Sequence, residues 1–355
     1  MTEDDVNENH SAEAAWRWAA SEDPHQRMAD MIYGYMVSQT VRAFAEFSVA
    51  DHLAEGALTS AQIAAREGSA PETTGRLLRA GIVYGLVEVD DEGRFHRTEL
   101  LDTLRSDASR SLRGMALGAT NTSHWAPWAA LPYGARVGTS QVRQTLGMPA
   151  FDYLVHNPEQ AREFTAYMES VTSLWAFDVV QAIDTRGVGL AVDIGGANGA
   201  LLRELLSANP ELHGVVFDRP DVADAVGPVL AESEFASRAS AFGGDFFEAV
   251  PSGDLYLLKF ILHDWDDDDC VRILTSCREA MRPGARVAII EMVVGEGNNP
   301  GVAAVMDLNM LAVTDGRERT LAQYDRLLAE AGFRRCSFWS NGSPQGVIEA
   351  VATTH

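Results

Sequence analysis

The sequence has little cysteine, a single lysine and no long apolar run. Its 355 residues include three cysteines without a CxxC pair, which argues against a disulfide framework or a thiolate zinc site. No apolar run approaches the roughly 20 residues that span a bilayer, and the acidic start lacks the basic region of a signal peptide. We therefore expect a soluble protein of the reducing cytoplasm.

Positive charge is scarce as well. The chain has 28 Lys and Arg residues against 51 Asp and Glu, a formal net charge of -23, and Lys259 is its only lysine. Nucleic acids are bound mainly by neutralising phosphates, and an anionic lipid surface would repel this chain. We therefore expect neither a nucleic-acid nor a membrane partner. The 46% of hydrophobic residues can form cores for roughly two domains.

The first part of the chain predicts an acidic extension (residues 1–30), the start of which we expect to be disordered, and a mainly helical domain (31–115). Apolar periodicity predicts a helix from about 31 to 53. Thr59 caps a second helix that continues to Arg66.

A further helix over 72–84 and a hairpin of strands at 86–90 and 94–97 complete a winged-helix outline. Most such outlines bind DNA. Residues 51–105, however, hold ten acids and six arginines. We therefore favour a dimerisation scaffold over a DNA-binding domain.

Residues 116–180 predict a helical linker that is rich in aromatic side chains. Core packing is the ordinary explanation of such residues, and a wall for a flat apolar ligand is the alternative, which spacing does not separate. The candidate wall residues, one of which lies later in the chain, are Trp125, Phe164, Tyr167 and Asn309.

Residues 181–355 predict strands that alternate with helices, such as one over 266–281. This order indicates an α/β fold with a mostly parallel, doubly wound, Rossmann-like sheet, in which ligands bind at the carboxyl ends of the strands. The predicted strands are 190–194, 215–217, 255–258 and 287–290.

Candidate binding residues follow the first three βα units. Asp193-Ile-Gly-Gly-Ala-Asn-Gly199 has Ala197 where a nicotinamide fingerprint needs glycine, so it suits a nucleoside without a pyrophosphate, or is a plain turn. Asp218 follows the second predicted strand, about 20 residues beyond this loop, where a carboxylate commonly accepts hydrogen bonds from the ribose hydroxyls of a bound nucleoside. Gly244-Asp-Phe-Phe247 offers a carboxylate for an adenine amino group and a ring for its face.

The fourth strand ends at Lys259, which can hold a ligand carboxylate, and His263 follows. A lone histidine is usually a core residue, but this one lies at the mouth of the predicted nucleoside site, which favours catalysis. The acids Asp266–Asp269 suit a helix N-terminus. They are consecutive and no second histidine lies near, so we predict no metal site.

Together these segments resemble the S-adenosylmethionine-dependent O-methyltransferases of the plant caffeate and hydroxyindole type, whose bacterial relatives tailor secondary metabolites, including polyketides and other aromatic compounds. The resemblance runs from about residue 30 to the end and includes a winged-helix dimerisation domain. The matching segments are Asp193–Gly199, Phe217–Asp221, Gly244–Phe247, Leu262–Asp266, Pro283-Gly284 and Asp315–Thr320.

The resemblance implies an S-adenosylmethionine cofactor, an aromatic or polyketide-type substrate and a homodimer formed through the N-terminal domain. It also implies that His263 is a general base flanked by Glu291, our first choice for orienting the imidazole, and Glu318, our second. The residues implied to hold or close over the cofactor are Gly195, Asp218, Asp245, Phe246, Lys259, Arg162 and Met168.

Two other functions stay open from the sequence. The same fold and cofactor can serve hydroxylation or decarboxylation, and a winged-helix regulator could sense a nucleoside. Retention of His263 and of the segment Gly316–Arg319 favours methylation. The acidic winged helix argues against the regulator.

Overall fold

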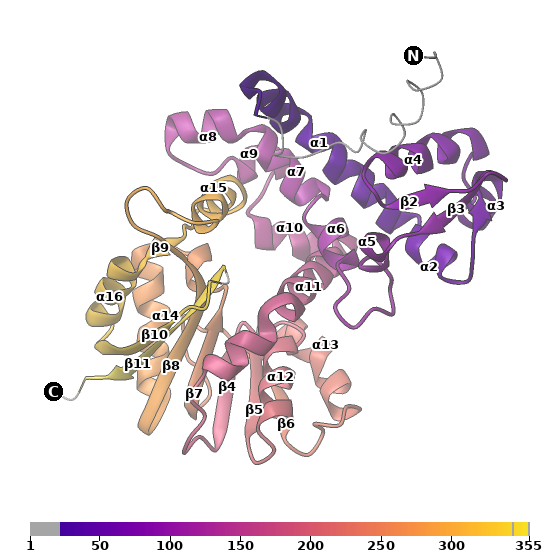
Figure 1. Cartoon of the computed structure of the whole chain (residues 1–355). Helices are drawn as coiled ribbons and strands as arrows, with labels where there is room; N and C mark the ends of the chain where they lie inside the picture. The colour runs from indigo at the N-terminus through magenta and orange to yellow at the C-terminus, as the bar shows by residue number, and fades with distance from the viewer. Residues whose placement is uncertain (1–21, 343, 354–355) are drawn as a thin grey trace, which may run out of the picture. The chain divides into compact units, whose positions relative to one another are not determined.

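The computed structural model describes residues 22–342 and 344–353, which divide by their contacts into two compact units (Figure 1). The N-terminal unit ends at Asn121 and also includes Ala166–Ser170; the C-terminal unit comprises Thr122–Thr165 and the chain from Val171 onward. The expected disorder at the start of the chain falls on residues 1–21, which lie outside the described residues.

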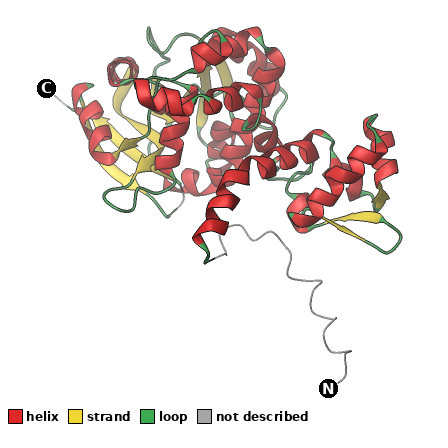
Figure 2. Cartoon of the chain, turned by 90° about the horizontal axis from the view of Figure 1, so that it is seen from above, coloured by secondary structure: helices red, strands yellow, loops and turns green. Residues whose placement is uncertain are grey.

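The N-terminal unit is mainly helical, with one small antiparallel sheet (Figure 2). Its elements are α1 (Pro24–Glu46), α2 (Val49–Ala54), β1 (Leu58–Thr59), α3 (Ser60–Glu67), α4 (Pro71–Val83), β2 (Val87–Val89), β3 (Arg94–Arg97), α5 (Glu99–Asp102) and α6 (Arg113–Gly118). The helices α3 and α4 and the hairpin β2–β3 confirm the predicted winged-helix outline. Thr59 caps α3 in a reciprocal capping box with Gln62. Strand β1, which we did not predict, pairs with β3.

The predicted single helix over 31–53 is wrong at both ends. Helix α1 begins at Pro24, inside the segment 1–30 that we assigned to the extension, because Asp23 accepts a hydrogen bond from the His25 N–H as its N-cap. The helix ends at Glu46, since Ser48 takes a left-handed φ of 45° before α2 starts. Apolar periodicity continues across this break, which is why the sequence pattern concealed it.

The C-terminal unit contains a sheet between two layers of helices (Figure 1). Its elements are α7 (Thr122–Ala129), α8 (Leu131–Val137), α9 (Val142–Leu146), α10 (Ala150–His156), α11 (Pro158–Ala182), β4 (Leu190–Ile194), α12 (Ala200–Ala208), β5 (His213–Asp218), α13 (Pro220–Ala231), β6 (Ala239–Gly243), β7 (Gly253–Lys259), a 3₁₀ turn (Leu262–Asp264), α14 (Asp267–Ala280), β8 (Met281–Val294), α15 (Ala303–Val313), β9 (Arg319–Thr320), α16 (Leu321–Glu330), β10 (Phe333–Trp339) and β11 (Gln345–Ala352).

The strand order β10–β11–β8–β7–β4–β5–β6, with β9 beside β8, confirms the predicted doubly wound sheet. The strands from β6 to β8 are parallel, whereas β11 runs antiparallel to both β8 and β10. The four predicted strands correspond to β4, β5, β7 and β8. The sequence reasoning missed β6, β9, β10 and β11.

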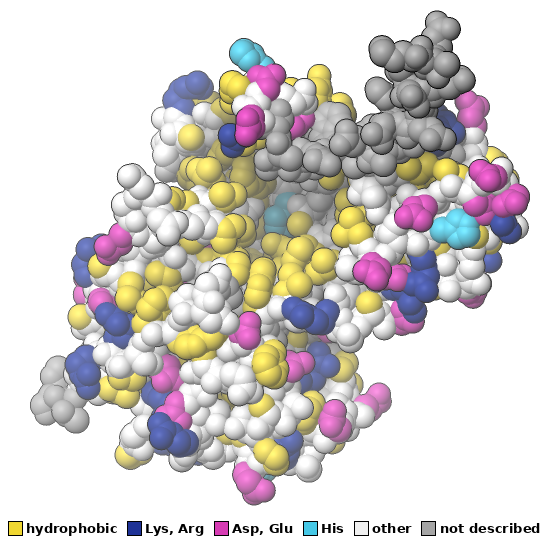
Figure 3. Space-filling model, viewed as in Figure 1, with side chains coloured by type: hydrophobic (Ala, Val, Ile, Leu, Met, Phe, Trp, Pro, Cys, Tyr) yellow, Lys and Arg dark blue, Asp and Glu magenta, His cyan; other side chains and the backbone are white. Residues whose placement is uncertain are grey.

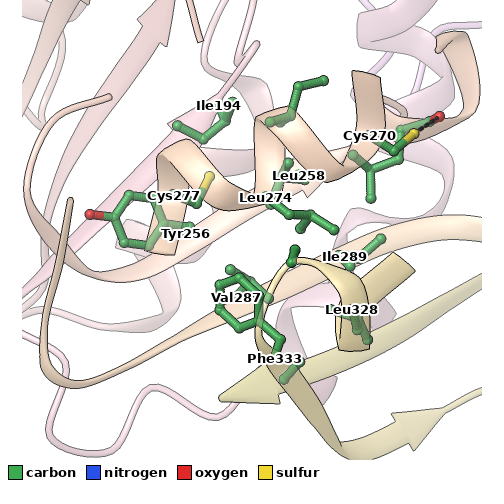
Figure 4. Close-up of a cluster of buried hydrophobic side chains, with 14 of the residues drawn as sticks. Ile194, Tyr256, Leu258, Cys270, Leu274, Cys277, Val287, Ile289, Leu328 and Phe333 are labelled. Atoms are coloured by element: carbon green, nitrogen blue, oxygen red, sulfur yellow. Dashed lines mark hydrogen bonds between the residues drawn. The ribbon is translucent and has the colours of Figure 1, made fainter. Parts of the chain in front are cut away.

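Alternation along the buried strands divides the core between the two faces of the sheet. Val192 and Leu258 pack with α14 and α16 on one face, the cluster drawn in Figure 4. Ala191 and Leu257 pack with α11, α12 and α13 on the other. All four side chains are fully buried. Burying a leucine contributes about 1.5–3 kcal/mol, so both faces hold the strands firmly in register.

Strand register brings the ends of the predicted binding strands together. Ile194 of β4 pairs with Phe217 of β5 and with Leu258 of β7, and Asp218 pairs with Gly243 of β6. The residues that follow these four strands therefore share one edge of the sheet.

The surface carries both signs of charge, and Figure 3 shows acidic and arginine side chains interspersed over the visible face of the C-terminal unit. In the part of the chain that the structure describes, no helix has the length and apolar character that a bilayer crossing requires.

Candidate active site

The turn after β4 leaves no room for a side chain at Gly195. This residue has φ +65°, and a Cβ there would lie 2.4 Å from Cδ1 of Ile261. Ala197 also takes a left-handed φ, of 47°, and its N–H donates to Oδ2 of Asp218 at 2.9 Å. The turn is therefore a tight backbone cradle that the second strand holds in shape.

A buried acid and the single lysine lie beneath this cradle. Asp193 is 2% exposed and its Oδ2 has no hydrogen-bond partner, while Nζ of Lys259 donates to Oγ1 of Thr172 at 3.0 Å. Burial raises the pKa of Asp193 to about 7, against the attraction of Lys259, and lowers the pKa of Lys259 to about 8, against that of Asp193 and Glu291. The attraction between Asp193 and Lys259 offsets only part of the cost of burying them, and Oδ2 of Asp193 is left without a hydrogen-bond partner.

The other three predicted cofactor residues of the sheet edge differ in exposure. The Asp218 carboxylate accepts the N–H groups of Ala197 and Arg219, and burial raises its pKa. Asp245 is exposed and accepts the Phe247 N–H at 2.8 Å, while Phe246 is half-buried. Asp218 therefore holds the turn after β4 in shape, whereas Asp245 uses only Oδ1 in its hydrogen bond to the Phe247 N–H.

His263 lies in the 3₁₀ turn after β7, hereafter the His263 turn (Leu262–Asp264). Its Nδ1 is 2.8 Å from Oε1 of Glu318, a hydrogen bond, and 3.6 Å from Oε2 of Glu291. Glu291 uses its other oxygen to accept the N–H groups of Ile261 and Leu262. The structure thus places both predicted acids beside the imidazole, but gives the hydrogen bond to Glu318, our second choice.

Ring stacking fixes the plane of the imidazole. The rings of Phe260 and His263 stack with their centroids 5.2 Å apart and an angle of 12° between the planes. Nζ of Lys259 lies 4.2 Å from the centroid of the Phe260 ring. Phe260 has φ 54°, an unusual value for a bulky residue, and donates its N–H to the Ile290 carbonyl. The position of Phe260 beside the base had no signal in the sequence.

His263, Glu291 and Asp264 all have shifted pKa values. Burial disfavours the charged imidazole, but Glu291, Asp264 and Glu318 outweigh it and raise the pKa of His263 to about 10. Burial raises the pKa of Glu291 to about 7 and that of Asp264 to about 6, although His263 opposes both shifts. An imidazole held between buried carboxylates is a strong, oriented base.

The same three side chains could also ligate a cation. The ligand atoms of His263, Glu291 and Glu318 all lie within 4.8 Å of one another. Two carboxylates and one imidazole are a common donor set for divalent metals. Residue spacing in the sequence therefore does not decide whether a metal binds here, and the prediction of no metal has to be tested by chelation.

The candidate wall residues of the C-terminal unit occupy different environments. Trp125 on α7 is 37% exposed, and Phe164 on α11 stacks on His124 with centroids 6.3 Å apart. Asn309 on α15 accepts the Trp128 indole N–H at 2.8 Å. Trp128 itself packs into a small hydrophobic core with Met310 and its neighbours. At least one aromatic side chain of the predicted linker is therefore a core residue.

The remaining predicted residues all lie on α11. Arg162 is exposed. Tyr167 and Met168 belong to the stretch of α11 that is grouped with the N-terminal unit, and burial raises the pKa of Tyr167. Their contacts with cofactor or substrate stay predictions.

The fold and this site define a methyltransferase. A family model described as an O-methyltransferase domain matches residues 128–334, and one described as an O-methyltransferase dimerisation domain matches residues 29–107. The chain therefore belongs to the family of O-methyltransferases with this dimerisation domain.

The individual relatives are named as methyltransferases. The chain is 33% identical over 324 residues to the phenazine O-methyltransferase of Lysobacter antibioticus (91% of this chain, 95% of the relative). It is 35% identical over 343 residues to the 8-amino-8-demethylriboflavin N,N-dimethyltransferase of Streptomyces davaonensis (94% and 98%). The crystal structure of human N-acetylserotonin methyltransferase with S-adenosylmethionine aligns with a TM-score of 0.87 and 32% identity, covering 94% of this chain and 99% of that one.

The protein is thus an S-adenosylmethionine-dependent O-methyltransferase, and its residues fit that cofactor. A Cβ at Gly195 would press on Ile261, so the turn keeps a bare backbone at the strand end, and Asp193 offers a buried, unpartnered oxygen to a cationic group. Asp218 and Lys259 end β5 and β7, and Asp245 follows β6, so all three lie at the same edge of the sheet.

Proposed function

We propose that the protein transfers a methyl group to a hydroxyl of an aromatic or polyketide-type small molecule, with His263 as the general base. The observation that carries this proposal is the buried imidazole whose Nδ1 is hydrogen-bonded to Glu318, at the edge of the sheet where the cofactor residues gather. Methylation of an oxygen needs a base for the hydroxyl proton and a fixed position for the nucleophile.

The chain's own residues divide this work. When bound, S-adenosylmethionine supplies an electrophilic methyl group on a sulfonium. Gly195, Asp218, Asp245, Phe246 and Lys259 would hold the cofactor at the strand ends, with Arg162 and Met168 closing over it. Because Nδ1 of His263 is hydrogen-bonded to Glu318, Nε2 is the ring nitrogen that would take the proton of the acceptor hydroxyl; Oδ1 of Asp264 lies 3.8 Å from this atom, beyond hydrogen-bond distance. Phe260 and the two glutamates keep the ring in one orientation.

The proton affinities suit a phenolic acceptor. A phenol has a pKa near 10, so an imidazole whose pKa is raised to about 10 takes its proton with little change in free energy. An unshifted imidazole would face a difference of about 3.5 units, or roughly 5 kcal/mol. The base must be neutral to act, so we expect kcat/KM to rise with pH above 7.

Replacing the base tests the proposal. We expect His263→Ala to lower kcat at least ~100-fold while the affinity for S-adenosylmethionine stays the same, because the imidazole acts on the acceptor. His213→Ala is the matched control, since His213 is exposed at the start of β5, at the other end of that strand from Asp218, and should leave kcat unchanged. Near-normal turnover of His263→Ala would disprove the assignment.

The acceptor and the competing chemistries are tested by product mass. Phenolic metabolites paired with the corresponding anilines separate an oxygen acceptor from a nitrogen one, a comparison suggested by the dimethyltransferase relative. Gain of a methyl group supports methylation, whereas gain of an oxygen or loss of carbon dioxide supports the alternative tailoring reactions. Activity that survives chelator treatment supports a metal-free role of the His263, Glu291 and Glu318 cluster.

We also propose that Trp125, Phe164, Tyr167 and Asn309 contact the acceptor, because flat apolar side chains suit a flat ring. The homodimer is supported by the matching dimerisation domain and by exposed apolar side chains on α1, such as Met31 and Ile32. The three free cysteines are consistent with the cytoplasm, and the charge of -23 favours a small-molecule partner over nucleic acid. Sedimentation velocity measures the oligomeric state directly.

A further inference from the structure

We propose that Arg319 is a positioning residue that holds the His263 turn in place for methyl transfer. This inference rests on the proposed role of His263 as the base. Among the described residues, Arg319 has the largest side chain that is fully buried, with an exposed fraction of 0%. It directly follows Glu318, which is hydrogen-bonded to the imidazole. Nothing in the proton transfer itself uses its guanidinium.

The guanidinium contacts the backbone on both sides of His263. Nη1 donates to the Leu262 carbonyl at 2.7 Å, and Nη2 donates to the Trp265 carbonyl at 2.7 Å. Nε and Nη2 also donate to Oδ1 of Asp267, at 3.0 and 2.8 Å. A planar guanidinium can serve several acceptors in fixed directions, which an ammonium cannot do.

The His263 turn has little support of its own. Its backbone hydrogen bonds, from Asp264 N–H to the Ile261 carbonyl and from Trp265 N–H to the Leu262 carbonyl, are 3.2 and 3.4 Å long. A single 3₁₀ turn with such bonds is weakly defined. The contacts from Arg319 are shorter and are charge-assisted. Glu291 holds the N–H groups at the start of the turn, and Arg319 holds its carbonyls, so the two side chains together set its position.

The backbone beside Arg319 grips the same turn. The Arg317 N–H donates to the His263 carbonyl at 2.8 Å, and a Cβ at Gly316 would lie 1.9 Å from that oxygen, so only glycine allows this approach. Arg319 in turn pairs with Val293 of β8, the strand that carries Glu291. The segment Gly316–Arg319 thus contacts the His263 turn, places Glu318 beside Nδ1 and pairs with β8.

A double-mutant cycle with His263 tests this role. We expect Arg319→Met to lower kcat ~10- to 100-fold, because loss of the two carbonyl contacts misplaces the base, with the affinity for S-adenosylmethionine unchanged. In the His263→Ala background the same change should cost nothing further, since the group being positioned is absent. Arg335→Met, which removes a two-bond ion pair with Asp325 elsewhere in the unit, is the control and should keep full activity.

The pH profile gives a second measurement that a general loss of stability would not alter. Glu318 raises the pKa of His263, so loosening their hydrogen bond in Arg319→Met should move the rise of kcat/KM with pH to lower pH. If Arg319→Met does not fold, Arg319→Lys replaces it: this variant keeps a cation beside Asp267 but cannot serve both carbonyls, and we expect a ~10-fold lower kcat.

The outcomes separate this proposal from the one it rests on. Losses that multiply in the double variant, or an unchanged kcat in Arg319→Met or its Lys substitute, would overturn the positioning role. Normal turnover in His263→Ala would instead overturn the base itself, whatever Arg319 does.

Discussion

The imidazole of His263 has two glutamate neighbours that are not equivalent. Glu318 makes the 2.8 Å hydrogen bond to Nδ1, whereas Glu291 lies 3.6 Å away and accepts two backbone N–H groups. We expect Glu318→Gln to lower kcat ~10- to 100-fold, because the amide oxygen can still accept the Nδ1–H but a neutral amide carries no charge to stabilise the imidazolium. Glu291→Gln should cost less, since the amide oxygen can still accept both N–H groups and the pKa of Glu291, about 7, leaves it partly neutral at that pH.

The pH dependence of the two variants checks this ranking. Both carboxylates raise the pKa of His263, so either substitution lowers that pKa and moves the rise of kcat/KM to lower pH. A kcat that falls further in Glu291→Gln than in Glu318→Gln would restore Glu291 as the orienting acid. Steady-state kinetics of both variants between pH 6 and 10, with a phenol of known pKa, would measure both effects.

At the scale of elements, the β4 turn contains Gly195, which has a positive φ and the closer neighbour of the two positive-φ glycines in that turn. We expect Gly195→Ala to weaken S-adenosylmethionine binding at least ~10-fold, because the new Cβ would meet Ile261 at 2.4 Å, beside the His263 turn. Gly187→Ala is the matched control: Gly187 has φ +74° with nothing within 4 Å of its would-be Cβ. It carries only the backbone cost of about 1–2 kcal/mol.

Calorimetric titration with S-adenosylmethionine and thermal melts of the two variants separate binding from stability. Both should lose stability, but only Gly195→Ala should lose affinity. Equal affinity in the two variants would show that the cradle tolerates a side chain and would remove Gly195 from the proposed cofactor contacts.

The elements that sequence reasoning recovered are those whose signals are local. Buried runs such as 190–194 and caps such as Thr59 depend on neighbours in the chain, so they could be predicted. Strands β6 and β10 are largely exposed along their length and exist because they pair with β5 and β11, which no local pattern reveals.

The site shows the same division between local and distant information. The strand-end rule located Gly195, Asp218, Lys259 and His263, because a parallel sheet gathers the residues that follow its strands. It could not rank Glu291 against Glu318, since Glu318 reaches the imidazole from a segment 55 positions away. For the same reason the segment that contains Arg319 could be recognised in the sequence, but the contacts of Arg319 with the His263 turn could not.

For the whole molecule, buried acids oppose the usual gain of stability toward neutral pH. The folded-state pKa values of Asp193 and Glu291 are raised to about 7 and that of Asp264 to about 6. The folded protein therefore binds protons that the unfolded chain has released above pH 4–5, so the free energy of unfolding falls as pH rises through this range. His263 acts in the same direction: its contribution is complete below pH 6.5 and is lost toward pH 10.

We therefore expect the Tm of the ligand-free protein to fall between pH 5 and pH 8, by ~5 °C or more, at constant ionic strength. Lys259 opposes this trend only above pH 8, because its lowered pKa of about 8 makes the folded protein release a proton that the unfolded chain keeps up to about pH 10. The lowered pKa of Asp90, about 2, matters only below pH 4.

Asp193→Asn removes one titrating group, so its melting curves, measured by scanning calorimetry, should depend less steeply on pH. A Tm that instead rises from pH 5 to pH 8 in the unsubstituted protein would mean that these acids are charged and satisfied in the folded state.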